Sequence, residues 1–318
     1  MNRGYIFIFL ATVFFSSMEV ALKTVAHDFN PMQLNCTRFL VGGLLLIPFA
    51  LRGLRQHGAR VTAAAWKGFA WLGFVGLVVS MMFYQMSILY APASVVSVLF
   101  SCNPVLVLAF AYLILRADIR PQHITALVME VADPLHTTLD PVGITLVLLS
   151  AATFALYAVL GKKQCAQYSG VAVTCFSCLA ASAEMIVLML ISHIPAVADA
   201  LQAAGLPMFA AMPFFSGYTT GNLLNVLYIC VFVTAGGYAC YFMGMEATSA
   251  MQGSLVFFFK PVLAPILAML ILGEEIPWNM WAGIGLMLVA SEVSMIPTWE
   301  TLLSVRPFII DRILHRRH

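Results

Sequence analysis

One segment of this chain occurs twice. Residues 84–119 align without a gap with residues 241–276, at a constant offset of 157, and 13 of the 36 positions carry the same residue. An apolar composition inflates matches among Leu, Ile and Val, but it does not place a tyrosine, a serine and a proline in one common register. Three such pairs are shared: Tyr84/Tyr241, Ser97/Ser254 and Pro104/Pro261. We infer an internal duplication, which limits the chain to folds made of two related halves.

The composition places both copies in a membrane. Hydrophobic residues make up 62% of the chain and charged residues 9%, whereas roughly 25% of residues are charged in soluble proteins. A membrane-spanning helix needs about 20 largely apolar residues, because its backbone groups must be paired within the segment. Nine stretches meet this requirement: 4–24, 32–51, 68–89, 93–115, 142–161, 169–192, 223–245, 249–272 and 277–297. A tenth, 121–133, has only 13 residues.

The distribution of lysine and arginine predicts the topology. If all ten segments cross, loops on one side hold 13 of the 16 basic residues and the other side holds only Lys23, with Arg38 and Lys260 inside spans. If residues 121–133 did not cross, the tally would become 7 against 7 and the asymmetry would vanish. We therefore predict an all-α protein with ten transmembrane helices, a short fifth helix, and cytoplasmic N- and C-termini.

Five helices per copy is an odd number, so the second copy should enter the membrane inverted. The predicted units are a first repeat at 1–140, a second repeat at 141–297, and a basic amphipathic tail at 298–318 on the cytoplasmic surface. The N-terminal helix is not expected to be a signal peptide, because Phe15 and Lys23 match Phe154 and Lys162 at an offset of 139. Inverted repeats predict a site between the halves, the arrangement used for alternating access.

Several chemistries are not expected. The seven cysteines are odd in number and lie mostly within spans, so no disulfide framework is predicted, and the Cys175/Cys178 pair is interpreted as buried small residues. The histidines are scattered, and the chain has neither an H-E-x-x-H motif nor a phosphate-binding G-x-x-x-x-G-K-[ST] loop. We expect no metal, no cofactor, no direct use of ATP and no enzymatic activity.

An ordered set of features resembles a known family. An early helix is followed by Lys23, Pro31 and Arg38, and the second repeat carries three further elements: Lys260-Pro261-Val262, Leu272-Gly273-Glu274-Glu275 and Trp281-Ala282-Gly283-Ile284-Gly285. This set resembles the EamA-type ten-helix transporters of the drug/metabolite transporter superfamily. The resemblance implies a multi-pass protein of the cell (inner) membrane. The first repeat departs from the pattern, with Leu115-Arg116-Ala117-Asp118 in place of Leu-Gly-Glu and a truncated fifth helix, which makes activity less certain than fold.

Charged residues inside spans are the first candidate site residues, since each costs roughly 2.5–3.5 kcal/mol at the bilayer centre. Glu19 and Lys23 are four residues apart on one helical face, which suits either a local ion pair or a site. In the second interpretation, Glu19 binds a substrate amine or carries a proton, with Arg38 as its alternating partner. Glu184 has no partner nearby in sequence and is a candidate for titration.

A second group of candidates comes from the repeat. Asn103 and Lys260 occupy the same position in the two copies, each directly before the shared proline. Proline disturbs the helix at the residue before it, so we expect either a ligand-binding break or a mere packing kink there. Lys260 would receive a substrate carboxylate and Asn103 would donate or accept neutral hydrogen bonds. Tyr84 and Tyr241 are expected to line an apolar cavity.

The sequence thus favours a secondary transporter that moves a small metabolite, an amino acid or related compound, by alternating access and in the direction of export. A facilitator without ion coupling is the main alternative, and an intramembrane enzyme or a receptor is less favoured. The expected partners are the small-molecule substrate and the lipid bilayer. Coupling to protons and a homodimer stay open, and no nucleic acid is expected.

Overall fold

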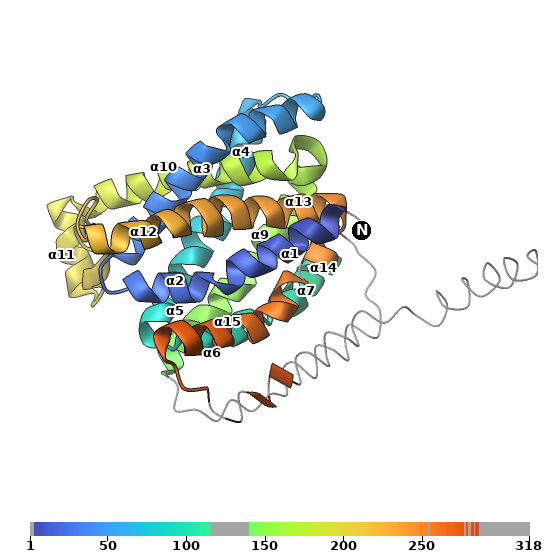
Figure 1. The fold of residues 1–318 in the computed structure, drawn as a ribbon. Coiled ribbons are helices and arrows are strands. Elements are labelled where there is room, and N and C mark those ends of the chain that lie inside the picture. Colours follow the sequence, from blue (N-terminus) through green and yellow to red (C-terminus); the bar gives the residue numbers. More distant parts are fainter. Residues whose placement is uncertain are drawn as a thin grey trace, which may run out of the picture.

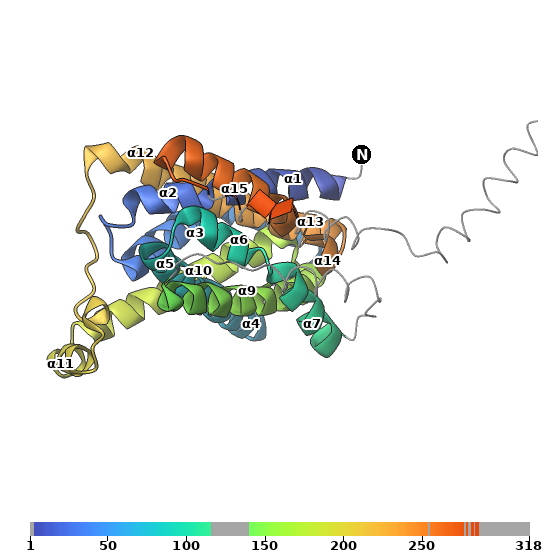
Figure 2. The same cartoon turned by 90° about the horizontal axis from the view of Figure 1, so that it is seen from below.

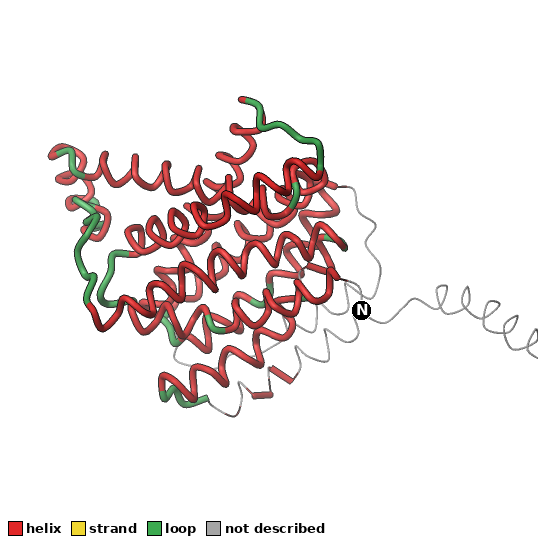
Figure 3. The backbone as a smooth tube through the Cα atoms, turned by 45° about the horizontal axis from the view of Figure 1, so that its top comes forward, coloured by secondary structure: helices red, strands yellow, loops and turns green. Residues whose placement is uncertain are grey.

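The computed structural model describes residues 3–115, 140–253 and 255–276, together with residues 278, 281, 282, 284 and 285. Every regular element in these ranges is a helix, and Figure 3 shows the long helices side by side with loops at the ends of the bundle. The predicted short fifth helix (121–133), the tail (298–318) and most of the predicted tenth helix (277–297) lie outside the described residues.

Eight of the predicted spans are helical, singly or as consecutive pieces (Figure 1). In chain order these are α1 (Arg3–Ser16) with α2 (Met18–Val25); α3 (Pro31–Gln56); α4 (Ala63–Gly73), the π-helix η1 (Phe74–Val79) and α5 (Ser80–Tyr90); α6 (Ala93–Phe100) with α7 (Asn103–Leu115); α9 (Pro141–Tyr168); α10 (Gly170–Ser192); α12 (Thr220–Tyr228), the π-helix η3 (Ile229–Tyr238) and α13 (Ala239–Ala247); and α14 (Ala250–Gly253) with α15 (Val256–Leu272). Figure 2 shows α11 (Pro195–Ala203) away from the bundle, beyond the end of α10; the short 3-10 helix η2 (Pro207–Phe209) follows it in the same loop.

Six of these helical segments are long and apolar enough to cross a bilayer by themselves: 3–25, 31–56, 63–90, 141–168, 170–192 and 220–247. The protein is therefore an all-α polytopic membrane protein.

Two long helices begin with the same N-cap arrangement, an Asn or Asp cap residue followed by proline. Asn30 accepts a hydrogen bond from the Met32 backbone N–H (2.9 Å), and Asp140 accepts one from Val142 (2.9 Å). Proline is favoured at the first helical position because its missing N–H would be unpaired there anyway.

The duplication is visible in the backbone. The π-helical segment η1 lies in the third helix of the first copy, and its counterpart at the offset of 157, residues 231–236, falls within η3. A π-turn widens the helix by one residue and recurs at functional positions. Both copies also break their fourth helix, between α6 and α7 in the first and between α14 and α15 in the second.

The position of these breaks corrects the prediction made from proline. In the first copy the break lies at Ser101 and Cys102, before Asn103 and Pro104. In the second copy Pro261 and Pro265 are inside α15, so the residue before Pro261 is helical. A break of the helix at Lys260 is therefore not formed, and the alternative of a packing kink stays a prediction. Neighbouring helices can compensate for the lost backbone bond in a membrane protein, which makes internal proline tolerable.

The fourth helices of the two copies run antiparallel where they meet. Glu274, just after α15, accepts hydrogen bonds from the backbone N–H groups of Ala93 (2.9 Å) and Ser94 (3.1 Å) at the start of α6. The Ser94 hydroxyl donates a third, at 2.7 Å. The residue after one helix thus caps the beginning of its counterpart, and Figure 1 shows α6 and α15 as neighbours. This orientation supports the prediction of inverted repeats.

A pair of equivalent lysines ties each third helix to the helix that begins its repeat. Lys23 donates to the carbonyl oxygens of Ile88 (2.6 Å) and Ala91 (3.1 Å). Lys162 donates to the carbonyl oxygens of Met245 and Thr248, the second at 3.1 Å. Both acceptors in the second copy lie 157 residues beyond those in the first, so the contact itself is duplicated. Lysine is well suited to the unpaired carbonyls at a helix C-terminus.

We predict that Lys23→Met and Lys162→Met each lower the free energy of unfolding by about 1–3 kcal/mol, because Lys23 donates to two carbonyl groups and Lys162 to three, and these lose their charged donor. Unfolding of the purified protein in detergent would measure this. Lys163→Met is the control, since Lys163 is adjacent and exposed. If Lys163→Met were as destabilising as Lys162→Met, the carbonyl contacts would not be the cause.

Candidate functional site

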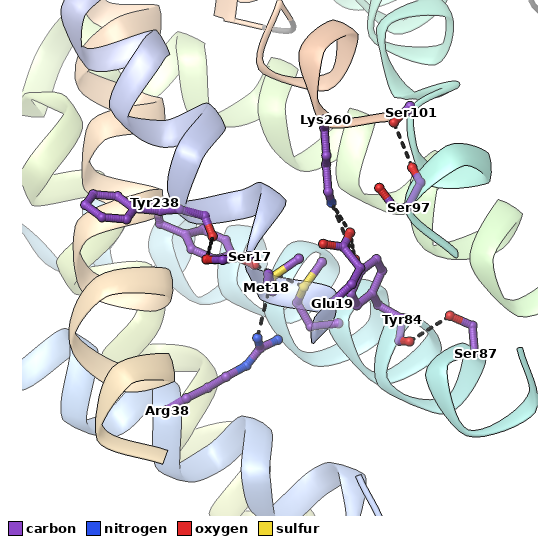
Figure 4. Close-up of polar contacts among 12 residues, drawn as sticks. Ser17, Met18, Glu19, Arg38, Tyr84, Ser87, Ser97, Ser101, Tyr238 and Lys260 are labelled. Atoms are coloured by element: carbon purple, nitrogen blue, oxygen red, sulfur yellow. Dashed lines mark hydrogen bonds and ion pairs between the residues drawn. The ribbon is translucent and has the colours of Figure 1, made fainter. Parts of the chain in front are cut away.

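The centre of the bundle holds a buried ion pair between helices of the two copies. Lys260 of α15 lies 2.5 Å from a carboxylate oxygen of Glu19 in α2, and neither side chain is exposed. Tyr84 of α5 donates its hydroxyl hydrogen to the same carboxylate, and the Lys260 ammonium lies 3.4 Å from the Tyr84 oxygen. Figure 4 shows these three side chains converging from three helices.

This pairing decides between the interpretations of Glu19. Lys23 is occupied by the carbonyl groups of Ile88 and Ala91, so the local Glu19–Lys23 ion pair is not formed. Arg38 is not paired with Glu19 either. The partner is Lys260, from the other end of the chain, which spacing along one helix could not indicate.

Glu19 lies two residues beyond a local irregularity of the first span. Ser17 is a single turn residue between α1 and α2, but its backbone angles are helical. Its N–H donates to the Val13 carbonyl (3.3 Å) and its carbonyl accepts from Ala21 (3.0 Å), so residues 3–25 form one continuous span. The Ser17 side chain bonds to the Phe14 carbonyl and to the Tyr228 hydroxyl (2.7 Å).

Aromatic rings enclose the charges. Three ring pairs are related by the duplication: Phe15/Phe154, Tyr84/Tyr241 and Phe100/Phe257. Their contacts repeat as well. The centroids of Tyr84 and Phe100 are 4.9 Å apart and those of Tyr241 and Phe257 are 5.9 Å apart, while Phe100 and Phe257 meet each other at 5.6 Å. We call these six residues the aromatic cage.

The aromatic cage also contacts the cation. The Lys260 nitrogen lies 4.7 Å from the Phe100 ring centroid and 5.8 Å from that of Phe257, within cation–π distance. A small void lies beside it, with no room for a water-sized sphere. Its lining is Phe15, Met18, Met81, Phe100, Phe154, Tyr238, Phe257 and Lys260. The site is therefore closed to solvent in this conformation.

Phe15, Phe100, Phe154 and Met81 were not predicted from the sequence, although a signal existed for the three phenylalanines. Phe15/Phe154 and Phe100/Phe257 are identities of the duplication, like Tyr84/Tyr241, so the same criterion would have selected them. Met81 and Tyr238 also correspond to each other at the offset of 157, and the Tyr238 hydroxyl lies 3.0 Å from the Met81 sulfur. These two differ in residue type, so the alignment could not mark them.

The charges are not duplicated. At the two offsets, Glu19 corresponds to Ala158, Arg38 to Ser177 and Lys260 to Asn103. Asn103 is buried and donates its amide hydrogen to the Ala151 carbonyl (2.9 Å), while its amide oxygen has no hydrogen-bond partner within the described ranges. A symmetric aromatic cage thus holds an asymmetric set of charges.

Arg38 of α3 is the second buried cation. Its side chain is fully buried, lies over the Phe39 ring at 4.6 Å, and points toward the Met18 sulfur at 3.8 Å (Figure 4). In the part of the chain that the structure describes, its Nε and Nη2 atoms have no hydrogen-bond partner.

Glu184 is not brought to this cluster. It lies half-buried on α10, and no hydrogen bond or ion pair within the described ranges joins it to Glu19, Lys260 or Arg38. A separate pocket of about 540 Å³ lies between α2, α12 and α15. It contains none of the residues predicted for the site, and its lining includes Val20, Thr24, Asn225, Tyr228, Leu267 and Ile271.

The described residues form a polytopic helical bundle whose closed centre holds buried charges, an arrangement typical of membrane transport proteins. The chain belongs to the EamA-like transporter family, whose family model matches residues 2–132 and 141–295. An uncharacterized transporter of Clostridium kluyveri is 30% identical over 92% of this chain and 93% of its own length. An uncharacterized transporter of Archaeoglobus fulgidus is 23% identical, covering 90% and 96% respectively.

A solved crystal structure shares the fold. It matches with a TM-score of 0.68 and 17% sequence identity, over 93% of this chain and 97% of that chain. The family and the names of the relatives support a multi-pass membrane transporter. They name no substrate, so the roles of the individual site residues are derived below from their geometry.

Proposed function

We propose that the protein is a secondary transporter that exports a small metabolite, an amino acid or a related compound, by alternating access between two inverted repeats. The observation that carries this proposal is the fully buried Glu19–Lys260 pair inside the aromatic cage. Buried charge in a membrane span is costly, and an ion pair lowers that cost only while both partners are in place. A substrate that carries charged groups of its own could exchange places with either partner.

The pair suits a gate as well as a binding site. Glu19 belongs to the first repeat and Lys260 to the second, so their contact joins the halves when the site is empty. When the halves move apart, Glu19 offers a negative group and Lys260 a positive group to the polar part of a substrate. The aromatic cage accommodates the apolar part of the substrate.

We further propose that the protein lies in the cell membrane with both chain termini in the cytoplasm.

Counterflow in proteoliposomes tests this proposal. Vesicles with the purified protein are loaded with one amino acid at high concentration, and uptake of a labelled trace of the same compound is followed across a panel. We expect saturable counterflow with at least one compound, and none with the Glu19→Leu/Lys260→Met double variant. A broad panel without saturable flux would contradict the proposal.

Ion coupling is a separate prediction. If Glu19 or Glu184 carries the coupled proton, Glu19→Gln or Glu184→Gln removes the acceleration of flux by a pH gradient and leaves exchange intact, because exchange needs no net proton movement. Rates are compared per folded molecule. An unchanged pH dependence in both variants would favour the alternative, a facilitator without ion coupling.

A further inference from the structure

Arg38 is a buried cation that has no anionic partner among the described residues. The carboxylate of Glu19 is shared between Lys260 and Tyr84, and the other ion pair of the described residues is His57–Glu246, near one end of the bundle. Two of the three guanidinium nitrogens have no hydrogen-bond partner in the described part of the chain. An isolated charge in such a place costs several kcal/mol even after relaxation of its surroundings.

Among the described residues, the centre of the protein therefore holds one more positive than negative charge. Glu19 and Lys260 neutralise each other, which leaves the guanidinium of Arg38 as the net charge of the site. Binding of a zwitterion or a neutral compound would leave the net charge of the site unchanged. Binding of a compound with one net negative charge would neutralise the site.

The surroundings of Arg38 lead to the void. Met18, which its Nη1 atom contacts at 3.8 Å, also lines the void beside Lys260. Methionine is unbranched and adaptable, so its movement would connect the guanidinium to the space within the aromatic cage. Tyr157 and Tyr241, both in ring contact with Phe154, have buried hydroxyl groups without partners in the described part. They add neutral donors to the same region.

The scaffold does not need a cation at this position. Ser177, the counterpart of Arg38 in the second copy, donates its hydroxyl hydrogen to the Val173 carbonyl at 2.6 Å within its own helix. The same type of helix packing is thus made with a small residue that satisfies itself. A large charged side chain in the first copy calls for another explanation.

We propose that Arg38 binds the carboxylate of the transported compound, and that the site prefers organic acids with one net negative charge and an apolar body. A guanidinium can bind a carboxylate through two parallel hydrogen bonds, which fits its two free nitrogens. This inference rests on the proposed function and narrows its substrate class. Among amino acids and related compounds, the site should bind deaminated acids more tightly than zwitterions, and zwitterions more tightly than amines.

The first test needs no ligand. Arg38→Met removes the unpaired charge and keeps much of the side-chain volume, so the melting temperature of the empty protein in detergent should rise by about 2–5 °C. Arg38→Lys keeps the charge and should not produce this rise. A melting temperature of Arg38→Met below that of the unsubstituted protein would overturn the proposal, because Arg38 would then be a structural residue.

The second test compares matched compounds: leucine, its deaminated acid 4-methyl-2-oxopentanoate and its decarboxylated amine 3-methylbutylamine, with the equivalent series from phenylalanine. We expect an acid to raise the melting temperature most and the amine not at all, with the shift absent in Arg38→Met and partly kept in Arg38→Lys. A shift by the amine alone, an acid shift that persists in Arg38→Met, or a panel in which no acid acts would each overturn the proposal.

Counterflow with the same compounds separates this inference from the proposed function. Flux of amines or zwitterions that does not depend on Arg38 would support the proposed transport function and contradict the carboxylate site at Arg38. Binding of acids through Arg38 without flux of any compound would support the carboxylate site and contradict the proposed transport function.

Discussion

Replacing Lys260 with methionine should lower the free energy of unfolding by about 3–5 kcal/mol, the largest effect that we expect from a single charge. Lys260 is the ion partner of Glu19, and both are fully buried. Without it, the carboxylate stays in an apolar aromatic surrounding with only the Tyr84 hydroxyl as a partner. Removing one member of a buried ion pair costs much more than the pair contributes, because the remaining charge is uncompensated. Reversible unfolding in detergent would measure the loss.

The double variant makes this prediction specific. Glu19→Leu/Lys260→Met removes both charges and should recover most of the lost stability, since replacing a buried pair with apolar residues is often neutral or stabilising. Transport should not recover, because the groups that meet the substrate are gone. Lys163→Met serves again as the exposed control. If the double variant were as unstable as the sum of both single variants, the two residues would act independently.

The second large effect is expected at Gly73. A Cβ atom at this position would lie 2.6 Å from the Ser177 backbone oxygen and 3.1 Å from the Ala181 backbone nitrogen. These are backbone atoms of α10, which cannot turn aside as a flexible side chain could. Gly73→Leu should therefore force α4 away from α10 and lower the free energy of unfolding by about 3 kcal/mol or more.

Gly221→Leu is the matched control for Gly73→Leu. A Cβ atom there would meet only the Thr219 hydroxyl oxygen, at 3.8 Å, which is an ordinary contact. It should change stability by less than about 1 kcal/mol. Equal destabilisation by both variants would show that membrane insertion of leucine, and not the α4–α10 contact, sets the result.

Much of the fold could be predicted because each helix is recognisable from one continuous stretch of sequence. A membrane helix must pair its own backbone groups, so each span is a continuous apolar stretch. The caps Asn30-Pro31 and Asp140-Pro141 mark where helices begin. The duplication is equally local, and it extends to contacts that the sequence did not reveal, such as the equivalent lysine caps of Lys23 and Lys162.

The candidate site was only partly predictable. The chain itself marks Glu19, Arg38 and Lys260 as charges within spans, and it marks Tyr84 and Tyr241 as conserved between the copies of the repeat. It also suggested Glu184, which lies apart from the cluster, and a possible helix break at Lys260, which is not formed. Proline position alone was misleading because neighbouring helices decide whether a backbone break is needed.

The sequence by itself determined that the chain is a duplicated, polytopic helical membrane protein with a few charges in its interior. Only the tertiary structure decided which of those charges meet. Glu19 has Lys23 one turn away, yet it pairs with Lys260 of the second copy, and Arg38 has no ion partner in the described part of the chain. The reason is physical: helix formation depends on neighbours in the chain, whereas ion pairing depends on which helix faces meet after packing.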